Sequence, residues 1–208
     1  MKFLLFSTSI LALSCAAPYK ALKSVPVDQT CVDKFRPQGI ATSWYSAGVD
    51  VVGKHLSGLL LIKQMPDESQ RVVFTSETGV TFFDFEFKAG TFQVKQAIPQ
   101  LRRKVVINTL RKDFETLLAI PFQQQTIDAS VLGDESFYGV TTIGEERAFF
   151  VTDDACSVLK RVEVGSKKPL FSIVSSGASP REPETIAIQH HTFNMVINLK
   201  KITRHVTE

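Results

Sequence analysis

Hydrophobic and polar residues alternate in short runs along most of this chain. In the clearest run, residues 81–87, three phenylalanines fall on one face and two acidic residues on the other: Phe83, Phe85 and Phe87 against Asp84 and Glu86. A period of two predicts half-buried β-strands. The predicted strands, in chain order, are residues 44–52, 55–63, 71–75, 81–87, 91–95, 136–142, 147–152, 157–164, 170–175, 185–190 and 195–202.

The connections between neighbouring runs are short. Residues 77–79 and 88–90 end in Gly79 and Gly90, which is typical of hairpin turns. Strands joined by hairpins pair antiparallel. We therefore expect a mainly β (α+β) fold with one antiparallel sheet of about ten to eleven strands, and a single domain over residues 41–205.

The period changes once, between two prolines. Apolar residues there follow helical spacing: Ile107, Leu110, Phe114, Leu117 and Leu118. This spacing predicts one main amphipathic helix over residues 102–118. Its first turn carries three cations, Arg102, Arg103 and Lys104, whose sign opposes the helix dipole. A solvated cationic face explains them, and so does a surface for phosphate head groups or an acidic partner.

The first residues have the layout of a secretory signal: one cation at Lys2, an apolar run, then small residues. The run ends Ala12-Leu13-Ser14-Cys15, which resembles a lipobox, the cleavage and lipidation site of bacterial lipoproteins. We therefore expect residues 1–14 to be a lipoprotein signal peptide and Cys15 to be the lipid anchor. Cleavage after Ala16, giving a secreted protein without lipid, is the alternative.

Resemblance to lipoproteins also implies a location. An acidic residue directly after the lipidated cysteine would retain the protein in the inner membrane, and this chain has Ala16 there. The resemblance therefore implies a bacterial outer-membrane lipoprotein, with its domain facing the periplasm. Residues 15–40 contain three prolines and no sustained period, so we expect a lipidated N-terminus and tether.

Two cysteines remain if Cys15 carries lipid. The periplasm is oxidising, so an even number of remaining cysteines favours a disulfide between Cys31 and Cys156. Two unpaired thiols are the alternative, because residues far apart in sequence need not lie close in space.

Composition and motifs narrow the function. The net charge of +3 gives no concentrated basic face, which argues against nucleic-acid binding. Sixteen phenylalanines bring much apolar ring area to bury, in a core or around a cavity. His190 and His191 are neighbours on a strand or turn, so their side chains point to opposite faces. Because zinc, nucleophile-elbow and phosphate-loop motifs are missing from the sequence, we expect no metal, no cofactor and no enzyme activity.

Several predicted strands, with the turns between them, carry a resemblance to a known superfamily: residues 56–63, 71–75, 81–85, 185–190 and 195–202. Together they resemble the lipoprotein-carrier superfamily with the LolA/LolB-like fold, over residues 43–202. The chain also resembles small uncharacterised lipoproteins of Bacteroidetes-type bacteria. The resemblance implies an unclosed antiparallel β-barrel whose concave face is covered by the helix.

The same resemblance implies a function. An apolar concavity would bind or handle a lipid or an acylated ligand, and its candidate lining is Leu59, Leu61, Phe83, Phe85, Phe87, Ile197 and Leu199. A fully packed core under the helix explains the same stripe. The alternative function is a non-enzymatic accessory subunit of the cell envelope that docks a protein partner through its sheet surface. A hydrolase with an unrecognised site is a third class.

Overall fold

The computed structural model of this chain describes residues 19–202, except residue 52, residues 124–125 and residues 143–145. The predicted signal peptide and Cys15 lie outside the described residues. Within them no helix is long and apolar enough to cross a membrane.

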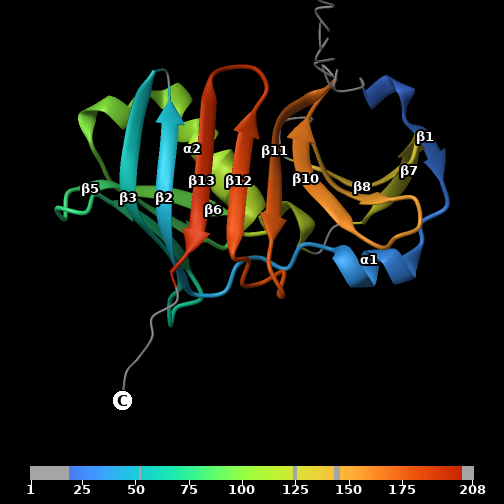
Figure 1. The fold of residues 1–208 in the computed structure, drawn as a ribbon, viewed down its shortest axis with the longest axis horizontal. Coiled ribbons are helices and arrows are strands. Elements are labelled where there is room, and N and C mark those ends of the chain that lie inside the picture. The colour runs from blue at the N-terminus through green and yellow to red at the C-terminus, as the bar shows by residue number, and fades with distance from the viewer. Residues whose placement is uncertain (1–18, 52, 124–125, 143–145, 203–208) are drawn as a thin grey trace, which may run out of the picture.

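One antiparallel sheet organises the described chain (Figure 1). Its thirteen strands are β1 (Lys23–Val25), β2 (Ser43–Val51), β3 (Lys54–Gln64), β4 (Gln70–Thr75), β5 (Thr81–Lys88), β6 (Thr91–Ala97), β7 (Asp128–Leu132), β8 (Glu135–Thr141), β9 (Arg147–Asp153), β10 (Leu159–Gly165), β11 (Pro169–Ser176), β12 (Thr185–His190) and β13 (Met195–Lys201). The strand order is β1-β7-β8-β9-β10-β11-β12-β13-β2-β3-β4-β5-β6. Since β1 and β6 end this order, the barrel is unclosed, as predicted.

The part of the chain that the structure describes contains few helices. They are α1 (Gln29–Phe35), α2 (Lys104–Leu117) and the short 3₁₀ turns η1 (Tyr19–Ala21), η2 (Pro99–Leu101) and η3 (Ile120–Phe122). Helix α2 is the predicted amphipathic helix. It ends where Ala119 takes a left-handed conformation, with φ of 58°.

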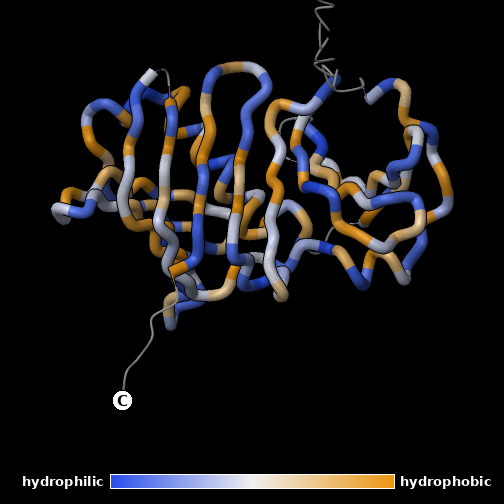
Figure 2. The backbone as a smooth tube through the Cα atoms, viewed as in Figure 1, coloured by the Kyte–Doolittle hydropathy of each residue, from blue (hydrophilic) through white to orange (hydrophobic). Residues whose placement is uncertain are grey.

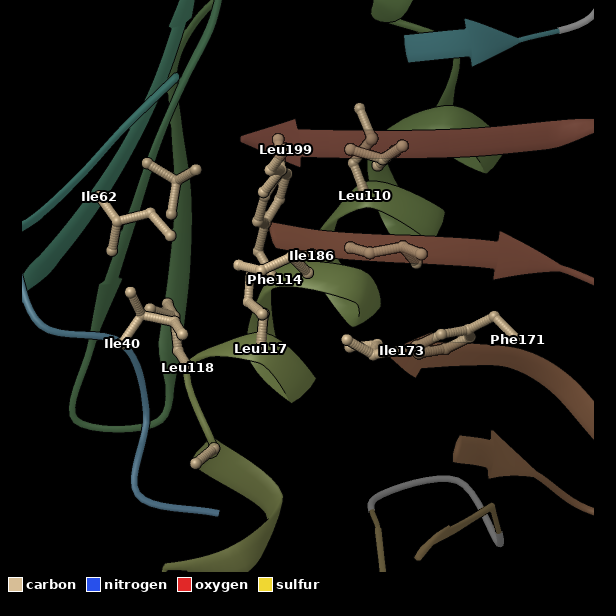
Figure 3. Close-up of a cluster of buried hydrophobic side chains, with 14 of the residues drawn as sticks. Ile40, Ile62, Leu110, Phe114, Leu117, Leu118, Phe171, Ile173, Ile186 and Leu199 are labelled. Carbon is tan, nitrogen blue, oxygen red and sulfur yellow. The ribbon is translucent and has the colours of Figure 1, made fainter. Parts of the chain in front are cut away.

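Hydrophobic and polar residues alternate along the strands (Figure 2), so one face of the sheet is buried in the main core. On β5, Phe83, Phe85 and Phe87 are buried while the residues between them are partly exposed. Helix α2 supplies the other side of the core through Leu110, Phe114 and Leu117, which lie among side chains of the surrounding strands (Figure 3). The concave face of the sheet is therefore filled by the helix.

A second, smaller core lies on the opposite, outer face of the sheet. Phe137 of β8 and Phe149 of β9 are buried there, and Tyr19 packs on them with its ring centroid 4.9 Å from that of Phe149. The backbone N–H of Tyr19 donates to the carbonyl of Lys167 at 3.0 Å. The segment that starts at Tyr19 is thus part of the folded domain.

This placement corrects the predicted tether for residues 19–40, and residues 15–18 of that prediction lie outside the described residues. Residues 23–25 form β1 and pair with β7, and helix α1 buries Cys31 and Val32. Asp28 caps this helix by accepting from the backbone N–H of Thr30 at 2.9 Å. Strands β1 and β7 are also the two beyond the predicted eleven. A three-residue strand is too short to display a period, and β7 mixes small and polar residues with its apolar ones.

Candidate functional site

The predicted apolar stripe is mostly packed core. Phe83, Phe85, Ile197 and Leu199 are each exposed by 2% or less. The rings of Phe83 and Phe85 stack at 4.3 Å, and Phe83 lies 5.6 Å from Phe114 of the helix. Only about 10 Å³ of empty space remains beside Phe83, which is room for at most one water. These four side chains hold the helix on the sheet.

The prediction is wrong for two of the lining residues. Leu59 is 36% exposed and Leu61 is partly exposed, whereas their neighbours Leu60 and Ile62 are buried in the core. Adjacent residues of a strand point to opposite faces, so Leu59 and Leu61 belong to the outer face of the sheet. The apolar run is continuous here, and a continuous run does not indicate which of its two alternating sets faces inward.

A buried polar pair joins helix α2 to the sheet. Asp113 of the helix is 0% exposed and His190 of β12 is 5% exposed. His190 Nε2 lies 3.0 Å from Asp113 Oδ1 and 3.1 Å from Oδ2. Burial raises the pKa of the Asp113 carboxyl, and the hydrogen bond and charge of His190 offset part of that rise. His191 lies on the other face, with Nε2 3.1 Å from Ser172 Oγ, as strand alternation predicts.

A cavity of about 270 Å³ opens beside the C-terminal end of helix α2, and we call it the linker cavity. Its walls come from the end of α1 and the segment after it, the end of α2, strands β10 and β11, and the loop that follows β11. Its apolar lining consists of Phe35, Pro37, Ile40, Leu117, Leu159, Val162, Ile173 and Pro180. Figure 3 shows Ile40, Leu117 and Ile173 in this part of the core.

The segment that walls the linker cavity is held in place at three points. Cys31 and Cys156 are brought together, with their sulfurs 2.02 Å apart, and this link fixes α1 to the turn between β9 and β10. Gly39 has a φ of +76°, and a Cβ at this position would lie 2.7 Å from the Leu118 carbonyl oxygen. The Ala41 N–H donates to the Arg181 carbonyl at 2.8 Å, which ties the segment to the loop after β11.

A second cavity, of about 690 Å³, lies on another side of helix α2, and we call it the hairpin cavity. The β5–β6 and β8–β9 hairpins border it, and Phe87, from the predicted lining, reaches it. Its charged side chains include Arg111, Lys112, Glu115 and Glu146. They form ion pairs, Arg111 with Glu115 at 2.7 Å and Lys112 with Glu146 at 2.5 Å. This cavity is more polar than the linker cavity, and its volume lies within the roughly 300–1,000 Å³ of small-molecule sites, whereas the volume of the linker cavity falls slightly below that range.

The sequence contained a signal for the buried polar pair but not for the linker cavity. Asp113 follows Leu110 by three positions and precedes Leu117 by four, so an acid stands on the apolar face of the predicted helix. An acid in that position requires a buried partner. The linker cavity left no such signal, because its walls come from segments far apart in the chain. No group of three or more metal-ligating side chains occurs among the described residues.

Comparisons with known proteins identify the fold. No protein-family model matches the chain, and no curated protein matches it. Among solved structures, a LolA superfamily protein from Nitrosomonas europaea superimposes with a TM-score of 0.50 at 10% sequence identity, covering 86% of this chain and 93% of that chain. A DUF1329 family protein from Desulfovibrio piger gives a TM-score of 0.43 at 8% identity, covering 84% of this chain and 89% of that chain. The chain therefore has the predicted LolA/LolB-like fold.

Proposed function

We propose that this protein is a periplasm-facing outer-membrane lipoprotein that binds a lipid or an acylated ligand, without catalysis, in the apolar linker cavity. The supporting observation is the lining of that cavity. Leu117, Val162 and Ile173 reach it from a helix and two strands, and the neighbouring core is already filled. An acyl chain has no hydrogen-bonding groups, so it gains free energy wherever it leaves water for such a surface.

The membrane attachment rests on Cys15. Its sequence context resembles a lipobox, and Tyr19, four positions later, is already packed on the outer face of the sheet. Four residues span at most roughly 14 Å. The proposal thus places the domain close to the bilayer. Metabolic labelling with an alkyne fatty acid should mark the wild-type protein and leave Cys15→Ala unlabelled, and labelling of both would contradict the anchor.

Ligand binding is tested by native mass spectrometry of the full-length protein released from non-ionic micelles. We expect bound saturated acyl ligands whose affinity rises about fourfold for each added CH₂ until the cavity is full, since each buried CH₂ contributes about 0.8 kcal/mol. Val162→Trp should fill the cavity and remove the bound ligand.

The matched control is Val174→Trp. Val174 is 50% exposed on β11, next to Ile173, so a tryptophan there leaves the cavity unchanged. Thermal unfolding of both variants verifies that they fold. If the wild-type protein takes up no acyl ligand, or if folded Val162→Trp binds as well as Val174→Trp, the proposed function is wrong.

A second candidate function is docking of an envelope protein through the outer face of the sheet. The corrected position of β3 favours it. Leu61 lies between Trp44 of β2 and Val73 of β4 in the strand register, and Leu59 is exposed on the same face. Crosslinking in cells from a photoreactive residue at position 59 would test this function, and a specific adduct absent from a control at Val105, which is exposed on helix α2, would support it.

A further inference from the structure

The charged residues that line the linker cavity all have one sign. They are Lys34, Arg36 and Arg181, and among the described residues no aspartate or glutamate lines this cavity. The hairpin cavity differs, because its three basic residues are matched by three acidic ones: Lys88, Arg111 and Lys112 against Glu68, Glu115 and Glu146. A rim that is merely polar would carry charges of both signs, as the hairpin cavity does.

Two of the three cations donate to backbone carbonyls. Lys34 Nζ donates to the carbonyl of Cys156 at 3.0 Å, and Arg36 Nε donates to the carbonyl of Phe122 at 2.9 Å. The Cys156 carbonyl positions the Lys34 ammonium without cancelling its charge. Arg181 lies on the exposed loop whose backbone is tied to Ala41. The rim therefore places positive charge beside an apolar interior.

The size of the interior limits the chain that it can take. A cavity of about 150 Å³ accommodates benzene, so about 270 Å³ holds roughly ten carbon atoms. The interior lining is aliphatic and aromatic, and the cations lie at the end of α1, on the segment after it and on the loop after β11, which flank the cavity. Such an arrangement suits an amphiphile with one short apolar chain and one charged end.

We infer that the linker cavity selects acyl ligands with an anionic head group, a carboxylate or a phosphate, which Lys34 and Arg181 bind while the chain lies against Leu117, Val162 and Ile173. This inference rests on the proposed function and specifies its ligand class. Hydrogen bonds between ionised partners are the stronger kind, and the Arg181 guanidinium can present two parallel donors to a carboxylate or phosphate.

The experiment compares three ligands of equal chain length: decanoate, decyl phosphate and 1-decanol. Each is titrated into full-length wild-type protein and into the double variant Lys34→Gln/Arg181→Gln, in the same non-ionic micelles, with native mass spectrometry as the readout. Comparing variant with wild type for each ligand separately cancels the different partitioning of the ligands into micelles. Lys34 and Arg181 are exposed, so their substitution leaves the core intact.

We expect the double variant to bind decanoate or decyl phosphate about tenfold more weakly and 1-decanol as wild type does. The ligand with the larger loss identifies the source, a fatty acid for the carboxylate or a phospholipid-derived ligand for the phosphate. A matched control, Lys20→Gln/Lys23→Gln, removes the same charge from exposed positions outside this cavity and should leave the binding of all three ligands unchanged.

Three results would overturn the inference. If wild-type protein binds none of the three ligands, the proposed function fails and the inference fails with it. If all three bind and the double variant binds them equally well, only the preference for an anionic head group is wrong. If the control pair weakens binding as much as the double variant, the effect is one of net charge and the cavity rim plays no special part.

Discussion

His190 Nε2 lies 3.0 Å from Asp113 Oδ1 inside the core, and this contact joins helix α2 to strand β12. Both side chains are nearly free of solvent, with exposed fractions of 5% and 0%. The hydrogen bond of this pair runs between His190 Nε2 and Asp113 Oδ2, at 3.1 Å. A polar pair of this kind specifies one position of the helix along the sheet, where apolar contacts alone would tolerate several.

Removing one partner should therefore be costly. Asp113→Ala leaves the imidazole of His190 buried without its hydrogen-bond partner, and we expect the free energy of unfolding to fall by about 3–5 kcal/mol. Replacing both partners, as Asp113→Leu/His190→Phe, should recover most of that loss because no buried polar group then remains unpaired. Denaturant titration measures both effects.

The control for this experiment is Glu115→Ala on the same helix. Glu115 is partly exposed and pairs with Arg111, so its loss should change the stability by less than about 1 kcal/mol. If Asp113→Ala is no more harmful than Glu115→Ala, the buried pair contributes nothing to the position of the helix.

The face assignment of β3 leads to a second prediction. Leu60→Ala should destabilise the fold by about 2–5 kcal/mol, because Leu60 is 0% exposed. Leu59→Ala should cost less than about 1 kcal/mol, because Leu59 is 36% exposed on the outer face. Chemical unfolding of the two variants compares them directly, and equal losses would mean that the strand is not oriented as described.

A third prediction concerns the covalent link. Cys31 and Cys156 are 125 positions apart in sequence. In the chain-entropy treatment, a disulfide that closes a loop of this length stabilises the folded state by about 5 kcal/mol at most. Cys31→Ser/Cys156→Ser should lower the free energy of unfolding by up to that amount. Reduction of the wild-type protein should have the same effect and should leave the double variant unaffected, and a wild-type stability that does not respond to reductant would contradict the bond.

The pH dependence offers a fourth prediction. Arg161 donates two hydrogen bonds to Glu135, at 2.7 and 2.8 Å, and they lower the pKa of this carboxyl below its ordinary value of 4.5. A lowered pKa stabilises the folded state above pH 4.5, and this contribution is lost as the pH falls through the folded-state pKa. The pair is partly exposed, so solvent screening keeps the effect modest.

We therefore expect Glu135→Gln to reduce the slope of stability against pH on the acid side. Denaturant midpoints measured between pH 5 and pH 3 should fall more steeply for wild-type protein than for the variant. Parallel curves would show that Arg161 does not depress the pKa of Glu135.

The sequence predicted the buried face of a strand best where charged and aromatic residues alternate. On β5 the phenylalanines are interrupted by acids, so only one face could be buried, and the structure buries that face. On β3 the apolar residues run together, so the pattern indicates a strand without indicating its face. The predicted helix is found because its period differs from that of the strands around it.

The candidate site was harder to predict because it is made by long-range contacts. Lys34 lies in the last turn of helix α1 and Arg36 directly follows the helix, whereas Arg181 lies more than a hundred positions later, and only the curled sheet brings them to one rim. The segment before β2 contains three prolines and one short helix, which in sequence look like a tether. Its buried Cys31 and the close approach of Gly39 to Leu118 are what make it a cavity wall.

The strand order also has a consequence for how the chain folds. Strand β2, near the start of the domain, pairs with β13, the last strand, and Met195 lies opposite Val51. Until the C-terminal residues have emerged, one edge of β2 has no partner and can pair with another molecule. Contacts between the two ends of a chain also slow folding, because a large loop must close first. We therefore expect truncation before β13 to yield aggregates, with β2 as the exposed edge.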